Sequence, residues 1–199
     1  MQFRIPLLLI EFMRYKEYSV NRVLEQSIKL FWKNGFKGCA INDIVNETGV
    51  NRFSLYHEFE NKEGILYASF KLYRERYCKE KFNLLKDGGN LADVLKTFFL
   101  SFLNENNTVP GCYFIHIGTE LADKDDRIKV LVDQYLTEIE LLFITLLQEN
   151  NIEEQRSELL ARHLIGLYCT SMSFCLIHTS EQRNLHIETG IHVILKNNG

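Results

Sequence analysis

Apolar residues recur at helical spacing through most of the chain. The first such segment carries an apolar stripe between a serine that can cap its start and a glycine that can end it: Val20, Val23, Leu24, Ile28 and Phe31, between Ser19 and Gly35. Two short helices are predicted next, at 41–47 and 51–57, joined by a turn at 48–50. Alternation with a period of two, the pattern of a β-strand, does not occur, so the sequence predicts an all-α protein.

Longer helices are predicted after residue 60. Asn61 can cap a helix that carries apolar and aromatic residues along one side. The clearest interior helix breaker is Asp87-Gly88-Gly89-Asn90, and Pro110-Gly111 interrupts the chain again. Between and after these breaks, helices are expected near 91–102, 112–121, 128–146, 153–179 and 187–194. The expected total is about nine helices, with no internal repeat.

The two short helices and their turn have the arrangement of a helix-turn-helix, whose second helix enters the major groove of DNA. Gly49 suits the turn because glycine tolerates a positive φ. Val50, Leu55 and Phe59 can pack inward, which leaves six residues to face outward: Asn51, Arg52, Phe53, Ser54, Tyr56 and His57. Arg and Asn can read base edges, Ser and Tyr can reach phosphates, and an aromatic ring can touch a thymine methyl group. By spacing alone, a helical hairpin with a polar surface fits equally well.

Charge is unevenly distributed along the chain. Residues 1–82 hold 14 Lys and Arg against 10 Asp and Glu, a net of +4, whereas residues 83–199 hold 9 against 16, a net of −7. A basic front half suits contact with phosphates, and an acidic rear half does not. The charge pattern therefore agrees with a DNA-binding head followed by a body that stays off the DNA, although a solvated surface can show the same asymmetry.

The residues from Val23 to Glu63 closely resemble the head of the tetracycline-repressor (TetR) family. The resemblance rests on Leu30-Phe31-Trp32-Lys33-Asn34-Gly35-Phe36, Ile41-Asn42-Asp43-Ile44-Val45 and Thr48-Gly49-Val50-Asn51-Arg52-Phe53-Ser54-Leu55-Tyr56-His57-Glu58-Phe59, followed by Lys62-Glu63. The stretch Gly111-Cys112 with Thr119-Glu120-Leu121-Ala122 is similar to one found in a subgroup of that family. The resemblance implies a head at 1–60, including an N-terminal extension, and an effector-binding and dimerisation domain at 61–199.

Carried over by position, the resemblance implies a DNA-binding set on and beside the second short helix. Asn51, Arg52, Phe53 and Ser54 would lie on the recognition helix, and Tyr56, His57 and Lys62 would contact phosphates. Two departures stand out: Cys39 and Ala40 occupy positions where the family usually has Thr or Ser, and Phe53 replaces a residue that is commonly small. The operator sequence therefore cannot be inferred from relatives.

The body is rich in aromatic residues, which indicate a packed core and, through the resemblance, a pocket for a small apolar or aromatic effector. The candidate ligand-binding residues are Phe98, Phe102, Tyr113, His116, Glu120, Tyr135, Tyr168 and Met172. Between 164 and 177 the chain is apolar nearly all round, which predicts a helix covered on both faces. The candidate dimer interface is Gly166, Thr170, Ser173, Ile187, Ile191 and Ile194.

Other chemistries receive little support. The sequence contains no GxSxG, HExxH, P-loop, GxGxxG or zinc-type Cys/His spacing, so neither a cofactor, a metal nor an enzyme is predicted. The five cysteines form no CxxC pair and fit a reducing cytosol. The apolar run at 2–10 is too short for a membrane span, lacks a cleavage site, and is interpreted as an extension of a cytoplasmic protein.

The favoured function is a ligand-responsive repressor. It would bind a pseudo-palindromic operator as a homodimer and leave it when a small effector binds. Two alternatives remain at this stage: a helical small-molecule or redox sensor that binds no operator, and an enzyme built on a helical bundle.

Overall fold

The computed structural model describes residues 18–103 and 111–196, and these residues form helices without strands. The elements are α1 (Val20–Gly38), α2 (Ile41–Thr48), α3 (Arg52–Phe59), α4 (Lys62–Tyr73), η3 (Arg74–Cys78), α5 (Lys79–Asn83), η4 (Leu84–Lys86), α6 (Leu91–Ser101), α7 (Tyr113–Leu121), α8 (Asp126–Glu149), α9 (Glu154–Ser173), η5 (Phe174–Leu176) and α10 (Ser180–Lys196). Because α4, η3, α5 and η4 follow one another without a gap, the described part contains nine helical rods. The predicted all-α fold is confirmed.

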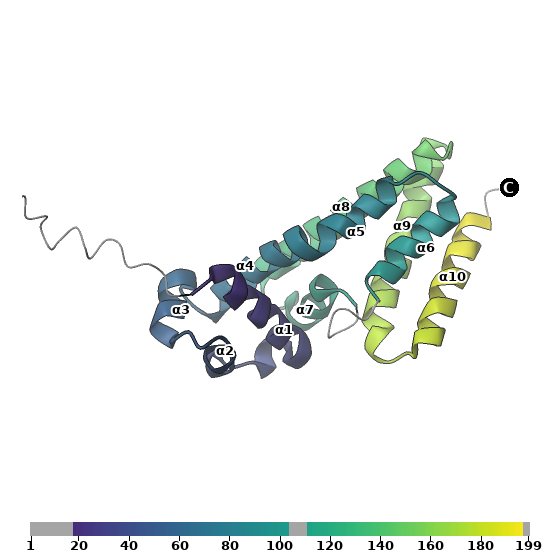
Figure 1. The fold of residues 1–199 in the computed structure, drawn as a ribbon. Helices are drawn as coiled ribbons and strands as arrows, with labels where there is room; N and C mark the ends of the chain where they lie inside the picture. Colours follow the sequence, from purple (N-terminus) through teal and green to yellow (C-terminus); the bar gives the residue numbers. More distant parts are fainter. Residues whose placement is uncertain (1–17, 104–110, 197–199) are drawn as a thin grey trace, which may run out of the picture.

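The molecule is elongated, with α1, α2 and α3 at one end and α6, α9 and α10 at the other (Figure 1). The long rod from α4 to η4 runs beside α8 and joins the two ends. Helix α7 lies between them and packs against α1 and α8. The short α7 therefore connects the N-terminal head, residues 18–60, with the body, residues 61–196.

The head is held together by the apolar faces that the sequence predicts. Ile44 of α2 and Leu55 of α3 are fully buried, and Val50 in the turn is nearly so. Gly49 takes the left-handed conformation, with φ 71° and ψ 3°, and ends α2. Asn51 caps α3 by accepting a hydrogen bond from the amide of Ser54 at 2.8 Å. Local signals of this kind set the element boundaries because they act within one helical turn.

One predicted boundary is wrong. The helix expected at 153–179 ends at Ser173, and η5 and a turn separate it from α10. Thr179 instead caps α10, because its hydroxyl accepts from the amide of Gln182 at 3.2 Å. A polar residue at the end of an apolar run marked a new helix start rather than a continuation. Two features interpreted from the sequence, the extension at 1–12 and Pro110, lie outside the described residues.

Candidate functional site

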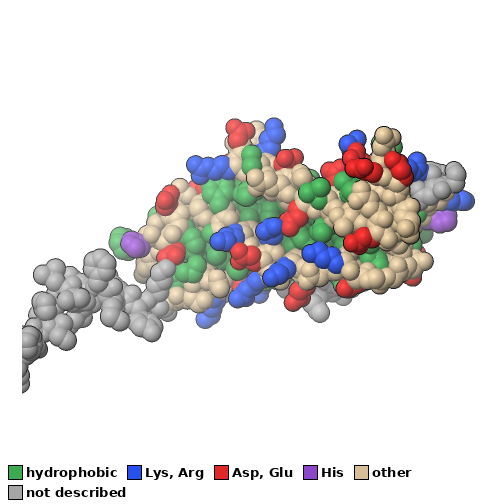
Figure 2. All heavy atoms as spheres, turned by 90° about the horizontal axis from the view of Figure 1, so that it is seen from above, with side chains coloured by type: hydrophobic (Ala, Val, Ile, Leu, Met, Phe, Trp, Pro, Cys, Tyr) green, Lys and Arg blue, Asp and Glu red, His purple; other side chains and the backbone are tan. Residues whose placement is uncertain are grey.

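Helix α3 presents a polar and aromatic surface at the tip of the head. Arg52, Phe53 and His57 are exposed, and 77% of Phe53 is accessible, the highest fraction among the exposed large hydrophobic residues. The Phe53 and His57 rings stack, with their centroids 6.4 Å apart. Figure 2 shows hydrophobic and histidine side chains projecting at this end of the molecule, away from the body. Polar and aromatic side chains exposed together on one short helix can contact both base edges and the thymine methyl group in a DNA groove.

The polar side chains of α3 differ in which neighbouring groups hold them. The guanidinium of Arg52 donates through Nη2 to Oδ1 of Asn42 in α2 at 2.7 Å, so α2 orients it. Ser54 is partly buried, and its carbonyl accepts from the Tyr18 hydroxyl at 3.2 Å. The Asn51 side-chain oxygen is occupied by the helix cap, which leaves its amide group as a donor. Asn42 is a positioning residue that sequence reasoning missed, since it lies ten residues from its partner.

Lys62 has a different environment from the rest of the predicted DNA-binding set. Its ammonium group donates to the carbonyls of Phe36 and Cys39, both at 2.9 Å, and lies 4.0 Å from the centroid of the Phe36 ring. These contacts hold the charge inside the head, at the end of α1. Lys62 is partly buried, and its contact with a phosphate stays a prediction.

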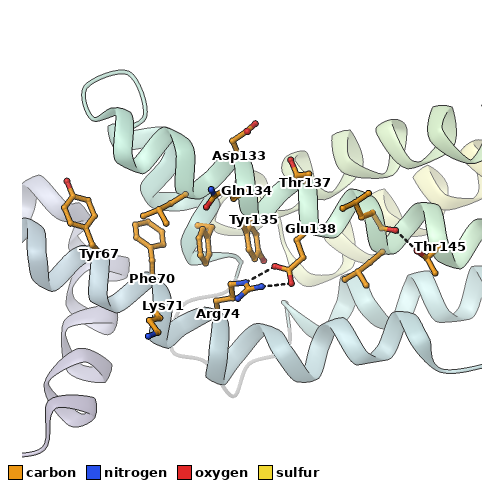
Figure 3. Close-up of a pocket in the computed structure, with 14 residues that line it drawn as sticks. Tyr67, Phe70, Lys71, Arg74, Asp133, Gln134, Tyr135, Thr137, Glu138 and Thr145 are labelled. Atoms are coloured by element: carbon orange, nitrogen blue, oxygen red, sulfur yellow. Dashed lines mark hydrogen bonds and ion pairs between the residues drawn. The ribbon is translucent and has the colours of Figure 1, made fainter.

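A groove opens between α4 and α8, with a volume of about 990 Å³. The side chains that define this α4–α8 groove include Tyr67, Phe70, Arg74, Phe114, Tyr135 and Glu138 (Figure 3). Aromatic rings form its floor: Phe114 stacks on Tyr135 with centroids 4.1 Å apart and contacts Phe70 at 4.6 Å. A volume of this size with an aromatic floor and a few polar groups is typical of small-molecule sites.

An ion pair bridges the two walls of the groove. Arg74 donates through Nε and Nη2 to the two carboxylate oxygens of Glu138, each at 2.8 Å, as the dashed lines in Figure 3 show. The hydrogen bond to Glu138 raises the pKa of Arg74, so the guanidinium remains charged. At one end of the groove the Tyr67 hydroxyl donates to Asp125 at 2.6 Å and lowers the pKa of that carboxyl group.

The candidate ligand residues inferred from the sequence are mostly core residues, and their contact with a ligand stays a prediction. Six of them are at most 4% exposed and pack inside the body: Phe98, Phe102, Tyr113, Tyr135, Tyr168 and Met172. Tyr135 alone among the predicted set also lines the α4–α8 groove. His116 is half-buried, and burial lowers its pKa, so the ring is neutral near pH 7. Glu120 binds backbone amides of α1 rather than facing the groove.

Cysteines add to the buried core rather than to a reactive site. Cys78 and Cys112 both donate to the Tyr135 hydroxyl, at 3.7 and 3.3 Å, and Tyr135 shares a 2.8 Å hydrogen bond with Tyr168. Burial raises the pKa of both thiols, which disfavours the reactive thiolate. No disulfide joins cysteines in the described residues, and no cluster of three metal-ligating side chains occurs there. Within the same ranges, no helix has the length and apolar content to cross a membrane.

An apolar face remains uncovered on α9 and α10. Gly166, Thr170 and Ser173 are exposed on α9, as the predicted interface requires. Ile187 and Ile191, however, are buried within the protomer, at 0% and 3% exposure, and Ile194 is partly buried. The exposed large apolar side chains of this region are instead Leu159, Phe174, Ile177, Leu185 and Val193. Because both faces of α10 carry apolar residues, the burial of Ile187 and Ile191 disfavours them as contacts with a second copy, and the dimer interface stays a prediction.

Known proteins share both the head sequence and the whole fold. Residues 23–68 match the family described as bacterial regulatory proteins, tetR family. The repressor ComR of Escherichia coli K12 is 30% identical over 113 residues, which are 55% of this chain and 54% of ComR. YezE of Bacillus subtilis, an uncharacterised regulator, is 23% identical over 192 residues, 91% of this chain and 98% of YezE.

The TetR-family regulator CifR, solved with a 26-base-pair operator DNA, superposes with a TM-score of 0.78 at 15% identity, over 90% of this chain and 98% of CifR. The head of this chain, over residues 23–68, belongs to the TetR family. As a TetR-family transcriptional regulator the chain carries a DNA-binding head, which is the part matched by the family description. The match to ComR spans about half of that protein's length, whereas the fold extends along nearly the whole of CifR.

For this TetR-family regulator, replacing Arg52 with alanine is expected to weaken specific DNA binding by about 1–3 kcal/mol and to relax sequence preference, because a guanidinium that reads base edges is removed. The measurement is fluorescence anisotropy with a duplex selected from a random library, compared with a scrambled duplex. Lys29→Ala, which removes an exposed charge from α1, is the matched control. Unchanged affinity and specificity for Arg52→Ala would show that the recognition-helix assignment is wrong.

Proposed function

We propose that this chain is a homodimeric repressor whose heads bind a pseudo-palindromic operator and which a small apolar or aromatic effector releases. The observation that carries the proposal is the exposed surface of α3, with Arg52 oriented by α2 and Phe53 held in solvent. The DNA-bound neighbour CifR supports operator binding by likeness of fold. An uncovered apolar face on α9 and α10 supports pairing of two copies, which would bring two heads to half-sites about one DNA turn apart.

The α4–α8 groove is the effector site in this proposal, in place of the core residues first predicted. It is open to solvent along one side, and its floor is formed by Phe70, Phe114 and Tyr135, each at most 2% exposed. The Phe70, Phe114 and Tyr135 rings favour an aromatic or apolar ligand, and the Arg74–Glu138 pair offers both a donor fork and a carboxylate at its edge. A ligand shifts the conformation only through a difference in affinity between two states, so it must contact elements that move.

The test uses an aromatic probe with a single sulfonate group, 1-anilinonaphthalene-8-sulfonate, with the full-length protein and a duplex selected from a random library. The probe is expected to gain fluorescence on binding and to lower duplex affinity. Thr137→Trp, which places a large ring in the groove, is expected to weaken probe binding by about tenfold, since a filled site excludes the ligand.

Lys129→Trp is the matched control, because Lys129 is exposed on the same helix and does not line the groove. Equal probe binding by both variants would place the effector site elsewhere. Failure of the wild type to bind any selected duplex at any salt concentration would support a sensor that binds no operator.

A further inference from the structure

The last turn of α1, after the kink at Gly35, is held from two sides by side chains of distant helices. The chain leaves helical geometry at Gly35, which has φ 73° and ψ 162°. A break at this position turns the next amides and carbonyls out of the helical hydrogen-bond ladder, so they need partners elsewhere. Residues 35–39, here called the turn segment, lead directly into α2 at Ile41. The contacts that hold the turn segment therefore also position the first turn of α2.

Glu120, at the end of α7, supplies the acceptors for the turn segment. Its Oε2 accepts from the amide of Phe36 and its Oε1 from the amide of Lys37, both at 2.8 Å. Both carboxylate oxygens are thus engaged with one backbone stretch some 84 residues away in the sequence. The approach is close enough that a Cβ at Gly35 would lie 2.9 Å from Oε2. Charge-assisted bonds to two successive amides fix both the distance and the orientation of the turn segment.

Lys62, the first residue of α4, supplies the donors. Its ammonium group binds the carbonyls of Phe36 and Cys39 at 2.9 Å each and lies over the Phe36 ring. The Glu120 carboxylate therefore binds amides of the turn segment, and the Lys62 ammonium group binds its carbonyls. We call the hydrogen bonds from Glu120 and Lys62 to the turn segment the turn clamp.

Helix α7 extends from the turn clamp to the α4–α8 groove. Phe114, in its first turn, lines the groove and stacks on Tyr135, and Glu120 lies six residues further along the same helix. The helix has little freedom to bend between them, because Ile117 is fully buried and a Cβ at Gly118 would lie 3.0 Å from Val132 of α8. A displacement of Phe114 is therefore carried to Glu120 by a short, tightly packed helix.

We propose that Glu120 is a positioning residue for DNA binding, and that α7 transmits the state of the groove to α2 through the turn clamp. The proposal rests on the proposed function, because it takes the groove as the ligand site and the head as the DNA-binding part. A ligand that moves Phe114 would shift the Glu120 carboxylate, and α2 with Asn42 would move relative to the body. Because Asn42 orients Arg52, the shift would reach the side chain that reads DNA.

Hydrogen exchange on the full-length protein tests the clamp itself. In Glu120→Ala, the amides of Phe36 and Lys37 are expected to exchange about tenfold faster or more, because their acceptors are lost. Amides in α9 should keep their protection. Glu149→Ala, which removes an exposed carboxylate at the far end of α8, should change neither group. If the Phe36 and Lys37 amides of Glu120→Ala exchange at the wild-type rate, Glu120 does not hold the turn segment and the proposal is wrong.

Affinity for the selected duplex tests the transmission. Glu120→Ala is expected to weaken binding by about two- to thirtyfold, and Glu120→Gln by less, since the amide oxygen still accepts one of the two bonds. Phe114→Leu should change affinity in the wild-type background and have no effect in the Glu120→Ala background, because the route to α2 is then missing. Glu120→Gln keeps the test valid if the alanine variant does not fold.

The outcomes separate the two proposals. If the wild type binds the duplex and the Glu120 variants bind equally well, the transmission is wrong and the proposed function stands. Equal effects of Phe114→Leu in both backgrounds would also overturn the transmission. If the wild type binds no duplex, the proposed function fails, and the transmission to DNA fails with it.

Discussion

Replacing Gly64 with alanine is expected to destabilise the head by about 3 kcal/mol or more and to abolish specific DNA binding. A Cβ at Gly64 would lie 1.8 Å from the carbonyl oxygen of Phe59 and 2.9 Å from its carbonyl carbon. Both are backbone atoms at the end of α3, so no side-chain rotation relieves the contact. The junction is already tight: Glu60 has a φ of 69°, and Asn61 accepts from the Gly64 amide at 2.7 Å. The added methyl group must displace α3 or α4.

Urea denaturation followed by circular dichroism would measure the loss of stability, and anisotropy with the selected duplex would measure binding. Gly88→Ala is the matched control, because no atom lies within 4 Å of its added Cβ. The control should remain within about 0.5 kcal/mol of the wild type. If Gly64→Ala has the same stability and DNA affinity as the wild type, the α3–α4 junction is looser than the structure shows.

Replacing Leu185 and Val193 together with glutamate is expected to give a monomer that binds the selected duplex about 10²–10⁴-fold more weakly. Leu185 and Val193 of α10 are 63% and 53% exposed and line a shallow hollow with Gly190. Burying two carboxylates at an apolar interface is strongly unfavourable. A monomer engages one half-site only and loses the high effective concentration of the second head, which accounts for the size of the effect.

Sedimentation velocity would report the mass of the particle, and anisotropy its affinity for duplexes with one or two half-sites. Val130→Glu is the control, because Val130 is exposed to a similar extent, 52%, on α8. It should leave the dimer and the affinity unchanged. A double variant that remains dimeric would exclude the face formed by Ile177, Leu185 and Val193 as the interface.

A comparison of the head with the body shows which structural features the sequence patterns do not predict. At the head, Asn61 caps α4 and Gly49 forms the turn after α2, as predicted, because each acts on neighbouring residues of the chain. In the body, Ile187 and Ile191 form a clear apolar stripe, yet that stripe packs inside the protomer. A helix with apolar residues on two faces does not indicate which face meets its own subunit.

The sequence by itself determined the all-α class, the helix-turn-helix and the exposed residues of α3, because periodicity, caps and turn residues act over one or two turns of chain. The family resemblance came from the same local stretch, Val23 to Glu63, and the matching family description covers residues 23–68. Only the tertiary structure decided the roles of Glu120 and Lys62. Their partners lie some 84 and 26 residues away, and the location of the groove depends on how α4 and α8 pack. Such contacts depend on how helices distant in sequence meet, which no spacing within a single helix specifies.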